Sequence, residues 1–240
     1  MAGVHLTPAE RLAGAVTAIA TAIVIAAVAI IPFLSPAWVS FEQGRSGAAQ
    51  LSGYSPAELG VATNAILSDL VLGPPEFDVA VGGEPVLNER ERGHMRDVRG
   101  VFAGFGVVAL VAAAGLAAAY VLARRAGHPE RAWAAIRNGA RGLAIGVVIA
   151  GVVAFFAFDA AFEVFHRLFF SGGSYTFDPG TDRLVQLFPF SFWSESTMAV
   201  GGLILVLALA VWFIAGRRLR PEAAAAPTGA ACVAAPGPAR

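Results

Sequence analysis

The sequence contains no lysine; all 17 of its basic residues are arginine. Enzymes that form a Schiff base or that use a Ser/Lys pair are therefore excluded. The one cysteine, Cys232, lies in a tail rich in alanine and proline, which excludes an intramolecular disulfide, a CxxC redox pair and a thiolate metal cage. The formal net charge is zero, so the overall charge gives no reason to expect a nucleic-acid partner.

Charged residues are scarce, at 14% of the chain against 57% hydrophobic residues, and the mean hydropathy is +0.66. This composition is typical of an integral membrane protein. Four apolar segments are long enough to cross a hydrocarbon core of about 30 Å, namely residues 12–34, 101–123, 142–164 and 198–216. The first is longer than the apolar core of a signal peptide, roughly 7 to 15 residues, so we expect a retained span. The sequence therefore predicts an all-α membrane domain over residues 1–220 with four transmembrane helices.

The arginines indicate how these spans are oriented. The short connection from Arg124 to Arg141 holds five arginines and one acid, and three more arginines follow the fourth span. Because cytoplasmic loops carry an excess of arginine, we expect both termini in the cytoplasm, with the tail 221–240 disordered there. The connections 35–100 and 165–197 then lie at the outer face of the cytoplasmic membrane.

The first of these outer connections has local structure of its own. Residues 55–72 begin with Ser-Pro and place a glutamate three residues after the serine, which predicts a capped helix. Residues 77–87 contain two apolar runs around a Gly-Gly pair, which predicts a hairpin. Asn88 and Glu91 form a second capping box, whose helix can continue into the second span. We therefore expect a small extracytoplasmic cap of helices and a hairpin.

Polar residues share one face at the outer end of the third span. At 100° per residue, Asp159, Glu163, His166 and Phe170 fall within about 60° of one another on a helix. Carboxylates and imidazoles are rare on apolar helices unless they face protein, water or a substrate. A carboxylate that accepts a hydrogen bond from one ring nitrogen of His166 raises the basicity of the other, so Asp159 or Glu163 is a candidate to align a general base.

A second histidine is predicted to point toward the same place. His94, with Asp97 beside it, shares a helical stripe with apolar residues at the start of the second span, while the neighbouring arginines lie on the opposite face. Each histidine alone is equally consistent with an interfacial anchor. Two imidazoles directed at one site are more consistent with acid–base chemistry, and either of them is a candidate base.

Aromatic and basic side chains around these histidines are candidates for contact with lipid. They are Arg167, Tyr175, Phe169, Phe170 and Trp193, which follow the third span or lie in the loop after it. Arg167 is a candidate phosphate ligand, whereas the other outer arginines are expected to pair with acids of the loops. Two histidines and one acid could bind zinc, but the sequence has no HExxH motif, so we predict neither a metal site nor a cofactor.

Three segments resemble a family of bacterial membrane proteins that span the membrane four times. They are Glu89–Val98 (ERERGHMRDV), Phe158–Phe170 (FDAAFEVFHRLFF) and Tyr175–Trp193 (YTFDPGTDRLVQLFPFSFW). The family is the lipoprotein intramolecular transacylase, or Lit, family. The resemblance implies an enzyme that moves the sn-2 acyl chain of a diacylglyceryl lipoprotein to the α-amino group of its N-terminal cysteine, giving a lyso-form lipoprotein. It also implies that His94 and His166 are the essential histidines.

The expected partners are thus diacylglyceryl-modified lipoproteins and membrane lipid, and the sequence does not predict an oligomeric state. The alternative is an integral membrane module that binds lipid or protein without catalysis. Such a module needs the spans and the aromatic residues but not paired histidines with carboxylates beside them.

Overall fold

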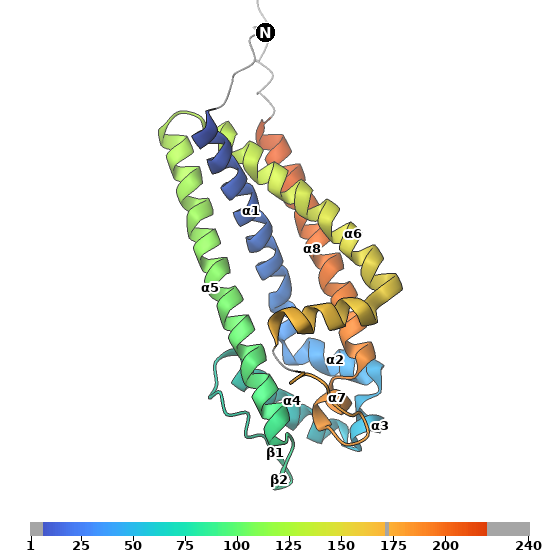
Figure 1. The fold of residues 1–240 in the computed structure, drawn as a ribbon. Coiled ribbons are helices and arrows are strands. Elements are labelled where there is room, and N and C mark those ends of the chain that lie inside the picture. The colour runs from blue at the N-terminus through green and yellow to red at the C-terminus, as the bar shows by residue number, and fades with distance from the viewer. Residues whose placement is uncertain (1–6, 171–172, 220–240) are drawn as a thin grey trace, which may run out of the picture.

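Four long helices form the body of the molecule in the computed structural model, which describes residues 7–170 and 173–219 (Figure 1). They are α1 (Pro8–Ile30), α5 (Glu89–Arg125), α6 (Pro129–Phe169) and α8 (Phe190–Leu219). All four are long and apolar enough to cross a membrane. The prediction of an all-α membrane protein with four spans is confirmed. The predicted disordered tail lies outside the described residues.

Local capping signals explain where two of these helices begin. Thr7 and Glu10 form a capping box at the start of α1, and Asn88 and Glu91 form another at the start of α5. In each box the N-cap side chain accepts from a backbone N–H of the first turn, and the glutamate accepts from the N-cap N–H. The predicted continuation of the helix from Asn88 into the second span is correct, since α5 runs without interruption to Arg125.

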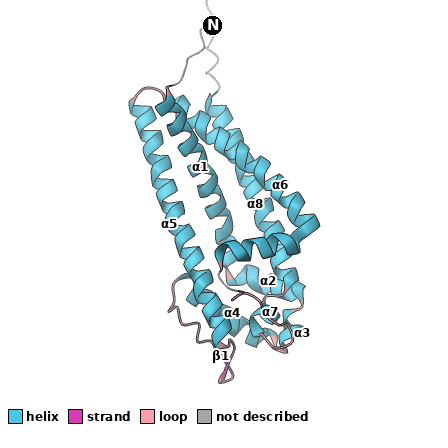
Figure 2. Cartoon of the chain, viewed as in Figure 1, coloured by secondary structure: helices cyan, strands magenta, loops and turns pink. Residues whose placement is uncertain are grey.

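Short elements at one end of the bundle make up the cap, on which Figure 2 shows the strands in magenta. The helix α4 (Pro56–Val71) and the hairpin β1 (Ala80–Val81) with β2 (Glu84–Pro85) match the prediction, and the pairing is antiparallel with Ala80 opposite Pro85. Four further elements were not predicted from the sequence, namely η1 (Ile31–Leu34), α2 (Pro36–Ser46), α3 (Ala48–Ser52) and α7 (Arg183–Leu187).

The two connections at the cap end of the bundle share one apolar core. Leu187 and Phe188 of the second connection pack with Ile66 and Phe77 of the first, and all four side chains are buried. Burial of apolar side chains is the main stabilising contribution in such a cluster. The cap is therefore one unit made by residues about 120 positions apart, which holds the second connection in a fixed place.

Small residues allow the spans to approach closely. A Cβ atom at Gly139 of α6 would overlap the backbone carbonyl of Ala18 in α1, so only glycine fits at this crossing. Ala140, Ala144 and Ala208 continue the contact between α6 and α8. Close packing of this kind stabilises helix association where lipid removes the hydrophobic driving force.

The third span differs from its prediction. Ala157 has non-helical dihedral angles (φ −144°, ψ 47°), and α6 changes direction there. Residues 158–169, which we call the transverse segment, run across the bundle between the spans and α2 toward α5 (Figure 1). The sequence predicts that the span continues to residue 164, because no proline marks the kink. Asp159, Glu163 and His166 therefore lie on a segment that crosses the cap end of the bundle and not on the span itself.

A buried glutamate of α2 gives a pH-dependent prediction for stability. The carboxylate of Glu42 is 1% exposed, and its Oε1 finds no hydrogen-bond partner within the described part of the chain. Burial, followed by the nearby Glu195 carboxylate, raises the pKa of Glu42 above its ordinary 4.5. A raised acid pKa means that the folded state holds its proton more tightly than the unfolded state, so stability falls as pH rises from 4.5 through the folded-state pKa. We expect Glu42→Gln to remove this loss and to raise the melting temperature at pH 7 but not at pH 4, by about 2–4 °C for each kcal/mol recovered.

Glu58 provides the matched control with the opposite sign. Hydrogen bonds from the backbone and side chain of Ser55 lower the pKa of this exposed glutamate. Its contribution is fully present above pH 4.5 and is lost as pH falls through the lowered folded-state pKa, so Glu58→Gln is expected to lower the melting temperature most at pH 7 and by less at pH 4. Thermal unfolding in detergent between pH 4 and 8 measures both. A Glu42→Gln gain that is equal at both ends of this range would contradict the account.

Candidate active site

His94 and His166 meet where the transverse segment reaches α5. Their ring centroids lie 6.1 Å apart with an interplanar angle of 24°, so the two imidazoles are stacked. Both residues are buried, at 7% and 8% exposure. The sequence placed the two histidines in separate segments 72 positions apart, and the fold brings them together as expected.

Aromatic rings enclose His94. The rings of Phe170 and Phe177 contact it edge to face, with centroid distances of 4.8 and 5.4 Å. The Nδ1 atom of His94 is buried and has no hydrogen-bond partner among the described residues. Because a charged imidazolium is costly in such apolar surroundings, we infer that His94 is neutral, with one ring nitrogen able to donate and the other able to accept.

His166 is oriented by its own helix. Its Nδ1 lies 2.8 Å from the backbone carbonyl oxygen of Phe162. A carbonyl oxygen can only accept, so Nδ1 carries the proton in this hydrogen bond, and Nε2 of the neutral ring is left as the acceptor. The rings of Phe162 and Tyr175 lie 4.0 and 5.0 Å from the imidazole. This is the tautomer that a general base working through Nε2 requires.

The carboxylates predicted to align the histidines are located elsewhere. Glu163 accepts from Arg167 Nε (2.7 Å) and from the Tyr175 hydroxyl (3.1 Å) instead of from His166. Asp159 and Asp97 are exposed. Asp159 precedes His166 by seven residues, or about 10 Å along a helix, which is too far for a hydrogen bond. The carbonyl oxygen of Phe162, one helical turn before His166, accepts the hydrogen bond from Nδ1. The group that aligns His166 is therefore a backbone carbonyl and not one of the predicted carboxylates.

The predicted lipid-contacting residues separate into two groups. Phe170 and Tyr175 lie against the histidines, with Phe170 5.4 Å from the His166 ring. Phe169 is 52% exposed and packs on Phe165, while Trp193 packs on the rings of Phe188 and Phe192 in the cap. Arg167, the predicted phosphate ligand, is paired with Glu163. Within residues 7–170 and 173–219, no three histidine, cysteine or acidic side chains gather as a metal site would require.

Most of the other outer arginines form ion pairs with loop acids, as expected. Arg92 contacts Asp78 and Glu89, and Arg96 contacts Glu89. These pairs are largely exposed, so each contributes little to stability.

Comparison with known families gives a match over residues 14–193, a range that contains both histidines and the loop beyond them. The matching family is described as lipoprotein intramolecular transacylase Lit. The chain belongs to this family. A Lit-family protein is an acyltransferase, so the predictions of the family and of an enzyme are confirmed.

A relative and two solved structures are similar to this chain. An uncharacterized protein of Aquifex aeolicus is 27% identical over 176 residues, which cover 72% of this chain and 76% of the relative. The crystal structure of the membrane-integral Lit from Bacillus cereus matches with a TM-score of 0.73 at 19% identity, covering 88% of this chain and 95% of that one. A variant of the same protein with one histidine replaced by arginine matches with a TM-score of 0.72 at 18% identity, covering 88% and 92%. At these identities the likeness establishes the shared fold.

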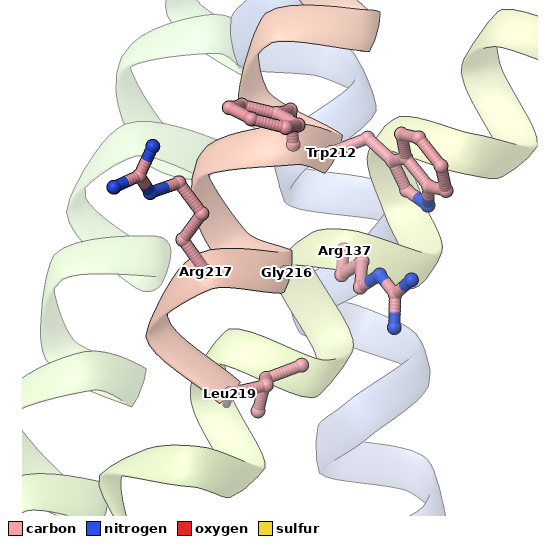
Figure 3. Close-up of a pocket in the computed structure, with 6 residues that line it drawn as sticks. Arg137, Trp212, Gly216, Arg217 and Leu219 are labelled. Atoms are coloured by element: carbon pink, nitrogen blue, oxygen red, sulfur yellow. The ribbon is translucent and has the colours of Figure 1, made fainter. Parts of the chain in front are cut away.

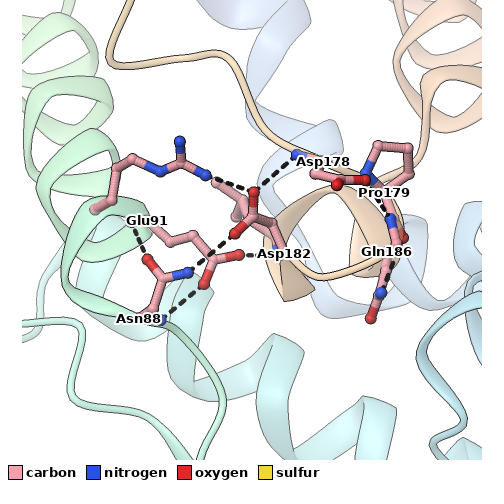
Figure 4. Close-up of polar contacts among 9 residues, drawn as sticks. Asn88, Glu91, Asp178, Pro179, Asp182 and Gln186 are labelled. Atoms are coloured by element: carbon pink, nitrogen blue, oxygen red, sulfur yellow. Dashed lines mark hydrogen bonds and ion pairs between the residues drawn. The ribbon is translucent and has the colours of Figure 1, made fainter.

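In this Lit-family chain, a polar network around the buried carboxylates of Glu91 and Asp182 anchors the loop after the transverse segment (Figure 4). The two carboxylate oxygens of Glu91 accept from the backbone N–H of Leu184 (2.6 Å) and of Asn88 (2.7 Å). Asp182 accepts from the Asn88 side chain (3.0 Å), from Arg90 (2.6 Å) and from the N–H of Asp178 (2.7 Å). The capping box indicated half of this network, whereas no local pattern pairs Glu91 with Leu184, 93 positions away.

The network reaches the histidines through one aromatic ring. The guanidinium of Arg90 lies 5.0 Å from the ring centroid of Phe177, and Phe177 in turn contacts His94. A cation above an aromatic face adds to the stability of such a contact. Glu91 and Asp182 therefore fix the loop that closes one side of the candidate site.

Proposed function

We propose that this protein transfers the sn-2 acyl chain of a diacylglyceryl lipoprotein to the α-amino group of its N-terminal cysteine. The observation that carries the proposal is the stacked pair of buried histidines, one of which holds the tautomer of a general base. The pair lies inside the range that matches the Lit family. The product would be a lyso-form lipoprotein with an N-acylated cysteine.

His166 Nε2 takes a proton from the substrate amine as the amine nitrogen attacks the ester carbonyl carbon. A new C–N bond forms, and the carbonyl oxygen becomes an oxyanion. The bond from the carbonyl carbon to the glyceryl oxygen then breaks, and His166 returns its proton to that oxygen, so no net proton is gained or lost. An amine with a pKa of about 7.7–8.0 is partly unprotonated at neutral pH, and a positioned base of this kind contributes about 10²- to 10⁴-fold.

His94 stabilises the oxyanion by donating a hydrogen bond from its neutral ring. Donors placed where charge develops in a site without water contribute about 10²- to 10³-fold each. Two observations support this role: His94 is buried, and its Nδ1 has no hydrogen-bond partner among residues 7–170 and 173–219, which leaves the ring able to donate to a substrate.

A covalent nucleophile is not needed for this transfer. The amine and the ester belong to one substrate molecule, so correct folding of the substrate supplies effective molarities of about 10⁵ to 10⁸ M. The aromatic rings of Phe162, Phe170, Phe177 and Tyr175 provide apolar walls for the acyl chain and the glyceryl group. Membrane lipid completes the surroundings on the exposed side of the transverse segment, where Leu168 is 75% exposed.

The site is proposed to lie at the outer face of the bacterial cytoplasmic membrane, with both termini in the cytoplasm. Arginines at the far end of the bundle support this orientation, among them Arg124 and Arg125 at the end of α5 and Arg217 and Arg218 at the end of α8. Lipoproteins carry their acylated cysteine at the outer leaflet, so this orientation presents the site to its substrate.

The proposal is tested by expressing the full chain in a bacterial host whose lipoproteins keep a free N-terminal amine. Mass spectrometry of a tryptic N-terminal lipopeptide then locates each acyl chain. We expect one chain to move from the glyceryl group to the amine with no change in total mass, because the transfer is intramolecular. If the peptides remain diacylglyceryl with a free amine while the protein is present and folded, the non-catalytic alternative is favoured.

A further inference from the structure

A cavity of about 190 Å³ lies at the end of the bundle remote from the cap (Figure 3). It lies between α6 and the last turns of α8 and plays no part in the proposed transfer. Its lining consists of two arginines, three apolar side chains and a glycine, namely Arg137, Arg217, Trp212, Phe213, Leu219 and Gly216. None of the lining residues described is acidic.

Arg137 of α6 lies beside Gly216 and Trp212 of α8 in this cavity (Figure 3). Its guanidinium carbon lies 5.3 Å from the ring centroid of Trp212. A Cβ atom at Gly216 would lie 3.5 Å from Arg137 Nε, which is ordinary contact, so a side chain larger than that of alanine at this position would compete for the space of the guanidinium. Arg137 Nε is buried and has no acceptor among the residues that the structure describes.

Positive charge at this end of the bundle is not balanced by the nearby acids that the structure describes. Glu10 pairs with Arg131, and Glu130 contacts His128. Arg217 lies over Phe213, at 5.8 Å from the ring centroid, and Arg218 lies over Trp133. A guanidinium held between an aromatic ring and a helix backbone is stabilised by an anion that supplies the missing acceptors.

We propose that this cavity binds the phosphate group of an anionic membrane phospholipid, with Arg137 as its principal ligand. The planar guanidinium matches two phosphate oxygens, and basic sites between transmembrane helices are suited to lipid head groups. The apolar surroundings favour a lipid over a free phosphate ion. Phe213 is 56% exposed and Ile214 51% exposed on the adjoining face of α8, where acyl chains can lie below the head group.

The test uses the purified full chain in detergent and native mass spectrometry with phosphatidylglycerol as the probe. Arg137→Gln removes the charge and is expected to raise the dissociation constant for the lipid about ten-fold, as loss of a charge-assisted contact does. Gly216→Leu keeps every charge but places a side chain in the cavity, and it is expected to lower binding as strongly. Arg124→Gln is the matched control, because Arg124 is an exposed arginine at the same end of the bundle and does not line the cavity.

Two further arms, run on the unmodified protein, distinguish the source of the phosphate. Diacylglycerol with the same chains lacks the phosphate and is expected not to displace phosphatidylglycerol. Glycerol 3-phosphate lacks the chains and is also expected not to displace it. The proposal is overturned if Arg137→Gln binds as well as the unmodified protein, if Arg124→Gln loses as much, or if either competitor displaces the lipid at equal concentration. Because the competitor arms need no variant, a variant that fails to fold does not remove the test.

Discussion

His166→Ala is expected to reduce the rate of acyl transfer by about 10²- to 10⁴-fold, and His94→Ala by about 10²- to 10³-fold. The first change removes the proposed base, and the second removes the proposed oxyanion donor. Because the two rings lie 6.1 Å apart and act on one intermediate, the double variant should be little slower than His166→Ala alone. Purified variants are compared on a synthetic diacylglyceryl-cysteine peptide, whose conversion to the lyso form is followed by chromatography and mass spectrometry.

Two controls separate catalysis from folding in this experiment. His128→Ala changes a histidine beside Glu130 at the far end of the bundle and should retain the full rate. Added imidazole should restore part of the rate of His166→Ala, because a free base can fill the space of the lost ring, whereas a merely unfolded variant would gain nothing. Full activity of either single variant would reject the role assigned to that histidine, and strictly multiplicative losses in the double variant would show that the two act independently.

Most of the local features that position His94 and His166 are predictable from the sequence. Capping boxes at Ser55 and Asn88 located the starts of α4 and α5, because a cap depends on residues only three positions apart. Helical periodicity placed His166 on a polar stripe, and it directed His94 toward the apolar side of α5. Such local patterns are readable because the interacting groups are neighbours along the chain.

The features that the sequence does not predict are of two kinds. Some depend on contacts between segments far apart in the chain, and others are backbone conformations that no residue type signals. The kink at Ala157 carries neither proline nor glycine, so the span was extended through the transverse segment. His166 was assigned a carboxylate partner because residue type suggests one, whereas the carbonyl of Phe162 provides the acceptor and no sequence pattern distinguishes one carbonyl from another. The contact between Glu91 and Leu184 joins two parts of the cap that only the folded chain brings together.

Glu91→Gln is expected to slow acyl transfer and to destabilise the cap, although Glu91 lies outside the proposed reacting groups. Each carboxylate oxygen accepts a backbone N–H, one at the start of α5 and one in α7. A glutamine side chain offers one oxygen and an NH₂ group, so one of these N–H groups loses its acceptor at a buried position, at a cost of about 1–3 kcal/mol. The loop that carries Phe177 is then held less firmly against His94, and we expect a rate reduction of about ten-fold or more at 25 °C.

Hydrogen exchange and a neighbouring glutamate show whether Glu91 acts by positioning the loop. The amide that loses its acceptor in Glu91→Gln, that of Leu184 or that of Asn88, should exchange faster, while amides in the first part of α6 remain protected, because both hydrogen bonds belong to the cap and not to the spans. Glu89→Gln is the matched control. Glu89 is two residues earlier, is largely exposed and forms ion pairs with Arg92 and Arg96 at the surface, so its loss should leave both the rate and the exchange unchanged. If Glu91→Gln exchanges faster throughout the bundle, or is slow without faster exchange at Leu184 or Asn88, Glu91 does not act by holding this loop against His94.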